Sequence, residues 1–319
     1  MLQTTWGALI GAYLFLGGMS AGAFATAGYL YLKDHEHHAR IVCISMWASA
    51  ICLGVGLLLL VFDLIHPIRG MQLWSAFSHW TTWMTYGAWG AFCAIIVFGL
   101  SALMATLPFS AWLAKKWNWY ARRMLSLRKG FAIAGIALGV FVAVYTGMLL
   151  MTAEGVPLWD TPLLPCLFTV SAFDTGVALV EVVAVSVSKR ELLQEWAHSV
   201  LEKAVIALVV AEVLVVVAFI MVLGNGNPSN AMSAAAAASV AMLTTGILAP
   251  YFWGMFILLG LGFPLVAALA GMTHLGKPAY PVMFIGAAGA LVGGCELRFL
   301  ILAAGVHADI VTATITSLI

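Results

Sequence analysis

The chain has 319 residues, of which 63% are hydrophobic and only 8% charged, and its formal net charge is +1. Soluble domains carry roughly 25% charged residues, so this composition excludes a water-soluble protein and indicates an integral membrane protein surrounded by the lipid bilayer. The basic residues form no stripe outside short loops, so we expect no nucleic-acid partner.

Eight stretches are long and apolar enough to cross a bilayer, which takes about 20 residues each. We therefore expect an all-α fold of eight transmembrane helices, near residues 6–32, 41–62, 82–107, 130–152, 163–187, 203–223, 247–271 and 280–304. The first stretch has no Lys or Arg before it and continues to Leu32, which is typical of a retained helix and not of a cleaved signal peptide. An Ala-rich stretch, 231–240, is expected to form a short helix or an interfacial lead-in to the seventh span.

The basic residues are distributed unevenly between the alternating loops. Of the 14 Lys and Arg residues, 12 fall on one side, Arg69 falls on the other, and Arg298 lies inside the last span. Loops rich in Lys and Arg face the cytoplasm. The sequence thus predicts a multi-pass protein of the inner (plasma) membrane with both termini on the extracytoplasmic side.

The cysteines and histidines argue against a redox cofactor of the protein's own. The five cysteines stand alone, without a CxxC pair or the spacing of an iron–sulfur ligand set. All eight histidines fall in predicted loops or at predicted span ends, whereas a transmembrane haem needs axial histidines inside helices. We expect no haem, no intrinsic iron–sulfur cluster and no metal site, so a redox role would require a mobile carrier and a partner subunit.

Residues with the chemistry of a quinone site fall on the predicted extracytoplasmic side. Tyr13 and Tyr145 have similar depths in the first and fourth spans, below outer segments that hold Asp63, His66 and Glu154. A quinone head needs hydrogen-bond partners at the polar end of an apolar slot, and its proton transfer needs a titratable group. We therefore predict that these side chains converge. The residues leave another interpretation open, in which the acid and histidine cap the second span and both tyrosines are packing aromatics.

Small residues are dense in the first and last spans. Close helix packing in lipid uses such residues, which explains most of them. Because Gly17 and Ser20 lie near Tyr13 in the sequence, they are also candidates to line a quinone groove, together with Trp159 from the segment between the fourth and fifth spans.

Acidic residues lie inside the predicted spans. Asp174 and Glu181 are seven residues apart in the fifth span, hence on one helix face, and Glu212 lies in the middle of the sixth. Ionisable groups within a membrane normally face the bundle interior, where they are paired or lie on a proton path. These acids outnumber the buried cations, and the alternatives of a proton relay and structural pairing both stay open.

Several of these segments follow one another in the order of a known family, the NrfD/PsrC family of membrane subunits of polysulfide, nitrite and related molybdopterin reductase complexes, which the sequence resembles. The segments that carry the resemblance are 13–22 (YLFLGGMSAG), 63–67 (DLIHP), 145–150 (YTGMLL), 157–159 (PLW), 164–165 (LP), 171–176 (SAFDTG) and 211–219 (AEVLVVVAF). They extend over most of the sequence.

The resemblance implies two four-helix bundles, with approximate halves 1–152 and 153–319. It also implies a menaquinone or ubiquinone pocket near the outer face, beside a ferredoxin-like four-cluster iron–sulfur subunit and a molybdopterin catalytic subunit on the extracytoplasmic side. Tyr145 matches the family tyrosine at the quinone head, and Asp63 matches the acid of the second-span motif. Tyr13 stands where some members have a histidine, and His66 replaces a residue that is often basic or glycine.

From these observations we expect a quinone- or quinol-binding membrane subunit of a respiratory molybdopterin oxidoreductase complex. It would exchange electrons between the quinone pool and the iron–sulfur subunit, oxidising quinol or reducing quinone, and would not be a complete enzyme alone. Two alternatives remain open at this point. One is a proton-coupled secondary transporter that uses the same buried acids, and the other is a passive anchor without a quinone site.

Overall fold

The computed structural model describes residues 6–34, 37–63, 83–153, 155–226, 230–273 and 280–307. Within them, eight helices are long and apolar enough to cross a membrane, which confirms the predicted all-α, eight-span fold. They are α1 (Ala8–Lys33), α2 (Ala39–Asp63), α4 (Trp83–Ala105), α6 (Asn118–Met151), α7 (Leu163–Val187), α8 (Glu195–Gly224), the continuous pair η2 (Tyr251–Gly262) and α10 (Phe263–Thr273), and α11 (Tyr280–Ala303). Two shorter helices are α5 (Leu107–Lys116) and α9 (Ala231–Thr244), so the Ala-rich stretch is helical.

Two helices differ from the sequence prediction at their starts. Helix α6 begins at Asn118 instead of residue 130, and α8 begins at Glu195 instead of residue 203. Hydropathy marks only the apolar part of a helix, while Arg, Lys and Glu are good helix formers and continue it into the interface. With 34 residues, α6 is about 51 Å long, well beyond the roughly 30 Å of a hydrocarbon core.

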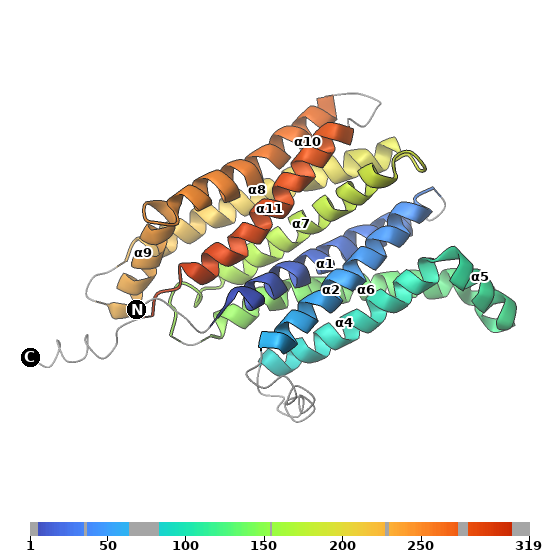
Figure 1. Cartoon of the computed structure of the whole chain (residues 1–319), viewed down its shortest axis with the longest axis horizontal. Coiled ribbons are helices and arrows are strands. Elements are labelled where there is room, and N and C mark those ends of the chain that lie inside the picture. The colour runs from blue at the N-terminus through green and yellow to red at the C-terminus, as the bar shows by residue number, and fades with distance from the viewer. Residues whose placement is uncertain are drawn as a thin grey trace, which may run out of the picture.

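The long helices lie side by side as two rings of four (Figure 1). In the first ring, α1 packs against α2, α2 against α4, α4 against α6, and α6 against α1. In the second, α7 packs against α8, α8 against α10, and α11 against both the η2–α10 helix and α7. Contacts of α7 with α1 and α6 join the two rings. The two rings agree with the expected two four-helix bundles. That the halves 1–152 and 153–319 are separate units stays a prediction.

The joint between the rings is a crossing of α1 and α7 at glycines. A Cβ atom at Gly22 would lie 2.2 Å from the carbonyl oxygen of Ala172, and one at Gly176 would lie 2.2 Å from the carbonyl carbon of Gly22. The two backbones therefore touch, as small residues allow in lipid. Helix α1 is accordingly the most buried of these eight spans, with 72% of an 18-residue apolar stretch inside the protein against 28% for α4.

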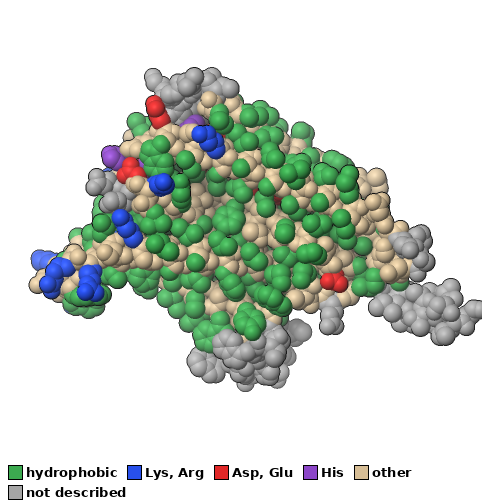
Figure 2. Space-filling view, turned by 180° about the vertical axis from the view of Figure 1, so that it is seen from behind, with side chains coloured by type: hydrophobic (Ala, Val, Ile, Leu, Met, Phe, Trp, Pro, Cys, Tyr) green, Lys and Arg blue, Asp and Glu red, His purple; other side chains and the backbone are tan. Residues whose placement is uncertain are grey.

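Basic side chains gather at one end of the molecule (Figure 2), which we call the basic end. It is defined by Lys33, Arg40, Lys115, Lys116, Arg122, Arg123, Lys129, Lys189 and Arg190. The N-terminal end of α1 and the C-terminal end of α11 lie at the other end of the molecule (Figure 1), which we call the opposite end. Most of the surface in Figure 2 between the two ends is hydrophobic or uncharged, as lipid contact requires.

At the basic end, the segment after α7 holds the start of α2. The carboxylate of Glu191 accepts hydrogen bonds from the backbone N–H groups of Arg40 (3.0 Å) and Ile41 (3.2 Å). The backbone N–H of Gln194 donates to Nε2 of the fully buried His38, 3.3 Å away. These contacts join the two rings at residues about 150 positions apart, and no pattern in the sequence indicated them.

Candidate functional site

Two tyrosines lie together inside the first ring of helices. Tyr13 of α1 is 3% exposed and Tyr145 of α6 is 6% exposed, and their phenol groups are close enough to interact electrostatically. Each ring covers a glycine of a neighbouring helix. A Cβ atom at Gly56 of α2 would lie 3.4 Å from the Tyr13 ring, and one at Gly87 of α4 would overlap the Tyr145 ring at 1.6 Å. The position of Tyr145 therefore depends on a glycine at residue 87.

Gly17 and Ser20 continue this region along α1. A Cβ atom at Gly17 would contact the Tyr13 ring at 3.7 Å and the Thr146 methyl group at 3.9 Å, so Gly17 borders the tyrosine pair. The fully buried Ser20 donates its hydroxyl hydrogen bond to the carbonyl oxygen of Gly17 over 2.8 Å. Ser20 thus uses its donor within its own helix.

The remaining predicted quinone residues are placed as follows. Asp63 is the last residue of α2 and is half-buried at the opposite end. His66 and Glu154 lie outside the described residues. Trp159 is 1% exposed, and its indole N–H donates to the carbonyl oxygen of Ile301 over 2.9 Å. The only donor of its side chain is therefore engaged at the end of α11.

The predicted relay acids lie in the second ring, away from the tyrosines. Asp174 and Glu181 of α7 and Glu212 of α8 are 2%, 3% and 1% exposed. Asp174 interacts electrostatically with both of the others. Among the described residues, one oxygen of Asp174 and one of Glu181 have no hydrogen-bond partner. A buried charge without a partner is costly, so these groups require a bound proton or a water molecule.

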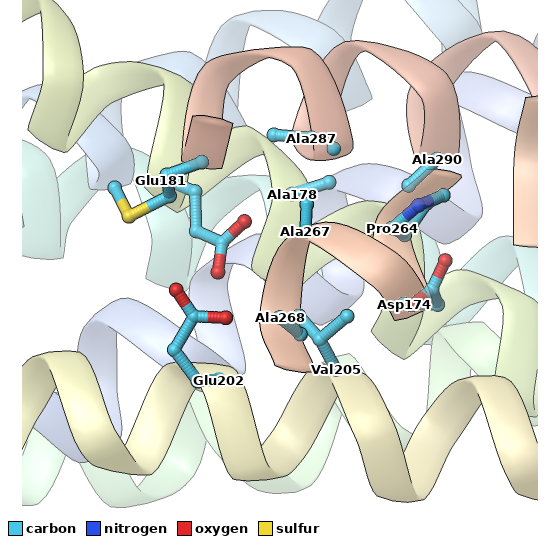
Figure 3. Close-up of a pocket in the computed structure, with 12 residues that line it drawn as sticks. Asp174, Ala178, Glu181, Glu202, Val205, Pro264, Ala267, Ala268, Ala287 and Ala290 are labelled. Carbon is cyan, nitrogen blue, oxygen red and sulfur yellow. The ribbon is translucent and has the colours of Figure 1, made fainter. Parts of the chain in front are cut away.

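Sequence reasoning missed two further titratable groups beside these acids. Glu202 of α8 is 3% exposed, and its carboxylate points toward that of Glu181 (Figure 3). Nε2 of His198 lies 3.3 Å from Oε1 of Glu202. His198 lies near the start of α8, which begins eight residues before the predicted span and so includes it. The spacing of four residues between the two, typical of one helix face, was the signal in the sequence.

A small cavity separates Glu181 and Glu202 from Asp174, between α7, α8, α10 and α11 (Figure 3). Its volume is about 10 Å³, close to the least that holds one water molecule. Apart from the three acids, its walls are apolar: Ala178, Val205, Pro264, Ala267, Ala268, Met283, Gly286, Ala287 and Ala290. The cavity is too small for an organic substrate and is suited to water.

Arg298 of α11 is a fully buried cation between the two regions. Its guanidinium group donates to the Ser171 hydroxyl, to the Gly294 carbonyl oxygen at 2.9 Å and to the Phe168 carbonyl oxygen at 3.2 Å. It also attracts Glu212 and Asp174 electrostatically. Arg298 thus provides Glu212 and Asp174 with a counter-charge.

The same guanidinium group reaches α1. A Cβ atom at Gly18 would lie 3.4 Å from one of its terminal nitrogens. Gly18 follows Gly17, which borders Tyr13. Arg298 therefore lies between two acids of the second ring, Glu212 and Asp174, and the part of α1 next to Tyr13.

Comparison with known proteins adds a family to this geometry. The family model described as "Polysulphide reductase, NrfD" matches residues 2–308. The C chain of the polysulfide reductase of Wolinella succinogenes is 29% identical over 312 residues, which amount to 94% of both sequences. Protein NrfD of Escherichia coli is 28% identical over 313 residues, again 94% of both sequences. The similarity extends through all eight spans.

Proposed function

The protein belongs to the NrfD polysulphide reductase family and is a multi-pass membrane subunit of a reductase complex. From this premise we propose that it binds a quinone near the opposite end, the end of the molecule away from the basic end. The observation that carries the proposal is the buried pair of Tyr13 and Tyr145. Two phenol groups within an apolar helix ring offer hydrogen bonds to a quinone head, while the surrounding helices accommodate an isoprenoid tail. Menaquinone and ubiquinone both fit this chemistry.

The proposed reaction is the oxidation of quinol, or its reverse. Quinol loses two electrons to an iron–sulfur partner and releases two protons, becoming quinone. In this scheme the Tyr145 hydroxyl orients the quinol oxygen, Gly17, Ser20 and Trp159 shape its surroundings, and Asp63, His66 and Glu154 carry protons to the nearby surface. Reduction of quinone runs through the same groups in the opposite direction. The protein supplies the quinone site and not the complete enzyme.

The partners and the orientation belong to the same proposal. We place the protein in the inner membrane with the basic end in the cytoplasm, because cytoplasmic loops are enriched in Lys and Arg. Both termini then lie outside. A ferredoxin-like four-cluster iron–sulfur subunit binds the opposite end and passes electrons to a molybdopterin catalytic subunit. The complex is then a respiratory oxidoreductase with its chemistry outside the cytoplasm.

The proposal also assigns a role to the buried acids of the second ring, Asp174, Glu181 and Glu212. They lead from the Arg298 region toward the basic end and act as a proton relay. Movement of protons along them, coupled to the quinone reaction, would transfer charge across the membrane. Structural pairing is the alternative role of these acids.

Substitution of Tyr145 by Phe tests the quinone site. The variant Tyr145→Phe should lower quinol oxidation by the assembled complex about tenfold or more, since one lost hydrogen bond to the reacting group is worth at least about 1.4 kcal/mol. Tyr120→Phe is the matched control, because Tyr120 is also a buried tyrosine of α6 but lies at its other end. Unchanged turnover in Tyr145→Phe would contradict the proposal.

Two further measurements separate the alternatives. A quinone analogue should bind the isolated protein and quench its tryptophan fluorescence, whereas a passive anchor would not bind it. A transporter would catalyse solute flux in vesicles without any partner subunit, an outcome that this proposal does not expect.

A further inference from the structure

We infer that His198 and Glu202 form the mouth of a proton-uptake path, which runs from the basic end of α8 through Glu181 to Asp174. The inference rests on the proposed function, since it assigns a proton source to the buried acids of the second ring. It adds two residues, a direction and a point of access to the relay.

The groups follow one another from the surface to the interior, and no hydrogen bond joins His198 Nε2 to Glu202 in the structure. The His198 side chain is 12% exposed, and its Nε2 lies 3.3 Å from Oε1 of Glu202, whose side chain is 4% exposed. The carboxylate of Glu202 points toward that of Glu181, and Glu181 shares the cavity with Asp174 (Figure 3). Exposure falls from His198 inward, so protons from water reach the series at the histidine.

Salt bridging does not account for this arrangement. Two carboxyl groups that face each other repel when both are ionised, and they are compatible when they share a proton. Among the described residues, the one contact of the series that could be an ion pair is His198 with Glu202, and it is one only when His198 is protonated. Glu181 has no cation beside it, and its Oε1 has no hydrogen-bond partner, in the part of the sequence that the structure describes. A proton held between the two glutamates satisfies both.

The surroundings select a proton over other ligands. The side chains that α10 and α11 turn toward the cavity are apolar, including Ala267 and Met283. No cluster of three or more His, Cys, Asp and Glu suited to a metal ion occurs among the described residues. With a volume of about 10 Å³, the space admits about one water molecule. Because Glu181 and Asp174 both line the cavity, we assign to such a water the transfer of a proton from one to the other.

Helix α10 leaves room for the mouth of the path. A Cβ atom at Gly271 would lie 2.5 Å from Oε1 of Glu202, so any side chain there would displace the carboxylate. The glycine lets α10 approach α8 while the carboxylate keeps its position beside His198. Gly271→Ala therefore disturbs the path without removing a titratable group.

The proton balance of the path is simple. His198 takes a proton from water on one ring nitrogen and passes a proton to Glu202. Each carboxyl group accepts a proton on one oxygen and releases one to the next group, and the water in the cavity carries it to Asp174. No electron moves in these steps, and only O–H and N–H bonds form or break. The path ends where Arg298 attracts Asp174 and Glu212.

Infrared spectroscopy of the purified complex tests the inference without relying on quinone chemistry. After transfer to D₂O, the C=O stretching band of a protonated carboxyl group shifts as its proton exchanges. In the wild type, a band that disappears in Glu202→Gln or Glu181→Gln should exchange rapidly. In His198→Ala the exchange should slow at least tenfold, and added imidazole should restore part of it, which a purely structural role of His198 would not produce.

Two controls keep the result interpretable. Glu195→Gln removes an exposed carboxylate from the first turn of α8 and should leave the band and its exchange unchanged. If Glu202→Gln fails to assemble, Glu202→Asp keeps a carboxyl group one methylene shorter and should slow the exchange, as should Gly271→Ala.

The outcomes separate this inference from the proposed quinone site. Absence of any carboxyl band sensitive to Glu181 or Glu202, or exchange equally fast in His198→Ala and wild type, would overturn the path. If Tyr145→Phe leaves turnover intact while the His198-dependent exchange is observed, the quinone assignment fails and the proton path stands.

Discussion

The indole nitrogen of Trp159 donates a hydrogen bond to the backbone carbonyl oxygen of Ile301, 2.9 Å away. Trp159 lies between α6 and α7, and Ile301 lies in the last turn of α11, where carbonyl groups lack partners within the helix. The bond therefore attaches the connection between the two rings to the last span. Trp6 packs edge-to-face on the same indole, with ring centroids 5.7 Å apart.

We expect Trp159→Phe to lower the free energy of unfolding by about 1–3 kcal/mol, because it leaves a buried carbonyl oxygen without its donor. Thermal unfolding of the purified protein in detergent measures the effect. Trp112→Phe is the control, since Trp112 is 54% exposed at the basic end and should not change the melting temperature. Equal melting temperatures for Trp159→Phe and wild type would show that the bond does not stabilise the opposite end.

The α1–α7 crossing gives a second prediction. Gly22→Ala would place a Cβ atom 2.2 Å from the Ala172 carbonyl oxygen, and a backbone neighbour cannot rotate away. We expect a loss of about 3 kcal/mol or more, at the upper end for overpacked interiors, seen as poor membrane accumulation and a low melting temperature. Gly99→Ala on α4 meets no atom within 4 Å and should behave as wild type.

The carboxylate of Glu191 caps α2 from a distant segment of the sequence, since it accepts the N–H groups of Arg40 and Ile41. Glu191→Ala leaves both donors without this acceptor, and we expect a loss of about 1–2 kcal/mol, as for other helix caps. Glu191→Gln keeps one carbonyl oxygen and should lose less. Limited proteolysis at the basic end measures the effect: we expect Glu191→Ala to be cleaved faster than Glu191→Gln. If Glu191→Ala and Glu191→Gln are cleaved as slowly as wild type, the cap does not stabilise α2.

His38 makes the stability of the folded protein depend on pH. Burial lowers the pKa of His38 from its ordinary 6.5, while Asp34 and Glu191 oppose part of this shift. Below about pH 6.5 the unfolded protein binds a proton that the folded protein does not, so stability falls as the pH drops. It stops falling once His38 is protonated in the folded state as well.

The variant His38→Gln should remove this part of the pH dependence, measured as melting temperature between neutral and mildly acidic pH. The nearby His37→Gln serves as the control, because the His37 side chain is 61% exposed. A slope that is the same in wild type and His38→Gln would assign the acid sensitivity to other groups.

The proposed orientation can be tested with reporter fusions. Alkaline phosphatase is active only outside the cytoplasm. Fused after Arg190, at the basic end, it should be inactive, and fused after Asn225, beyond the end of α8, it should be active. The reverse pattern would place the basic end outside and move the proposed partner subunits to the other side of the membrane.

Hydropathy alone predicted all eight spans, because a helix that crosses lipid needs about 20 apolar residues whatever it packs against. It did not predict where α6 and α8 begin, since their first turns are polar and lie beyond the hydrocarbon core. It also did not predict the π-helical hydrogen bonding of η2 (Tyr251–Gly262), for which the residues carry no local signal. The sequence placed Tyr13 and Tyr145 at one depth, and the fold places them in one helix ring.

What the sequence could not determine is which helix faces meet. The depth of Glu181 in its span follows from counting residues, but its partner Glu202 lies on another helix, and the two face each other only because α7 and α8 are neighbours in the second ring. The same holds for Arg298 against Gly18 and for Gly22 against Gly176. In a bilayer every span is apolar enough to insert by itself, whereas the contacts between spans depend on close packing of small residues from distant segments. The sequence by itself therefore determined the number of spans, whereas only the tertiary structure determined which residues surround each buried charge.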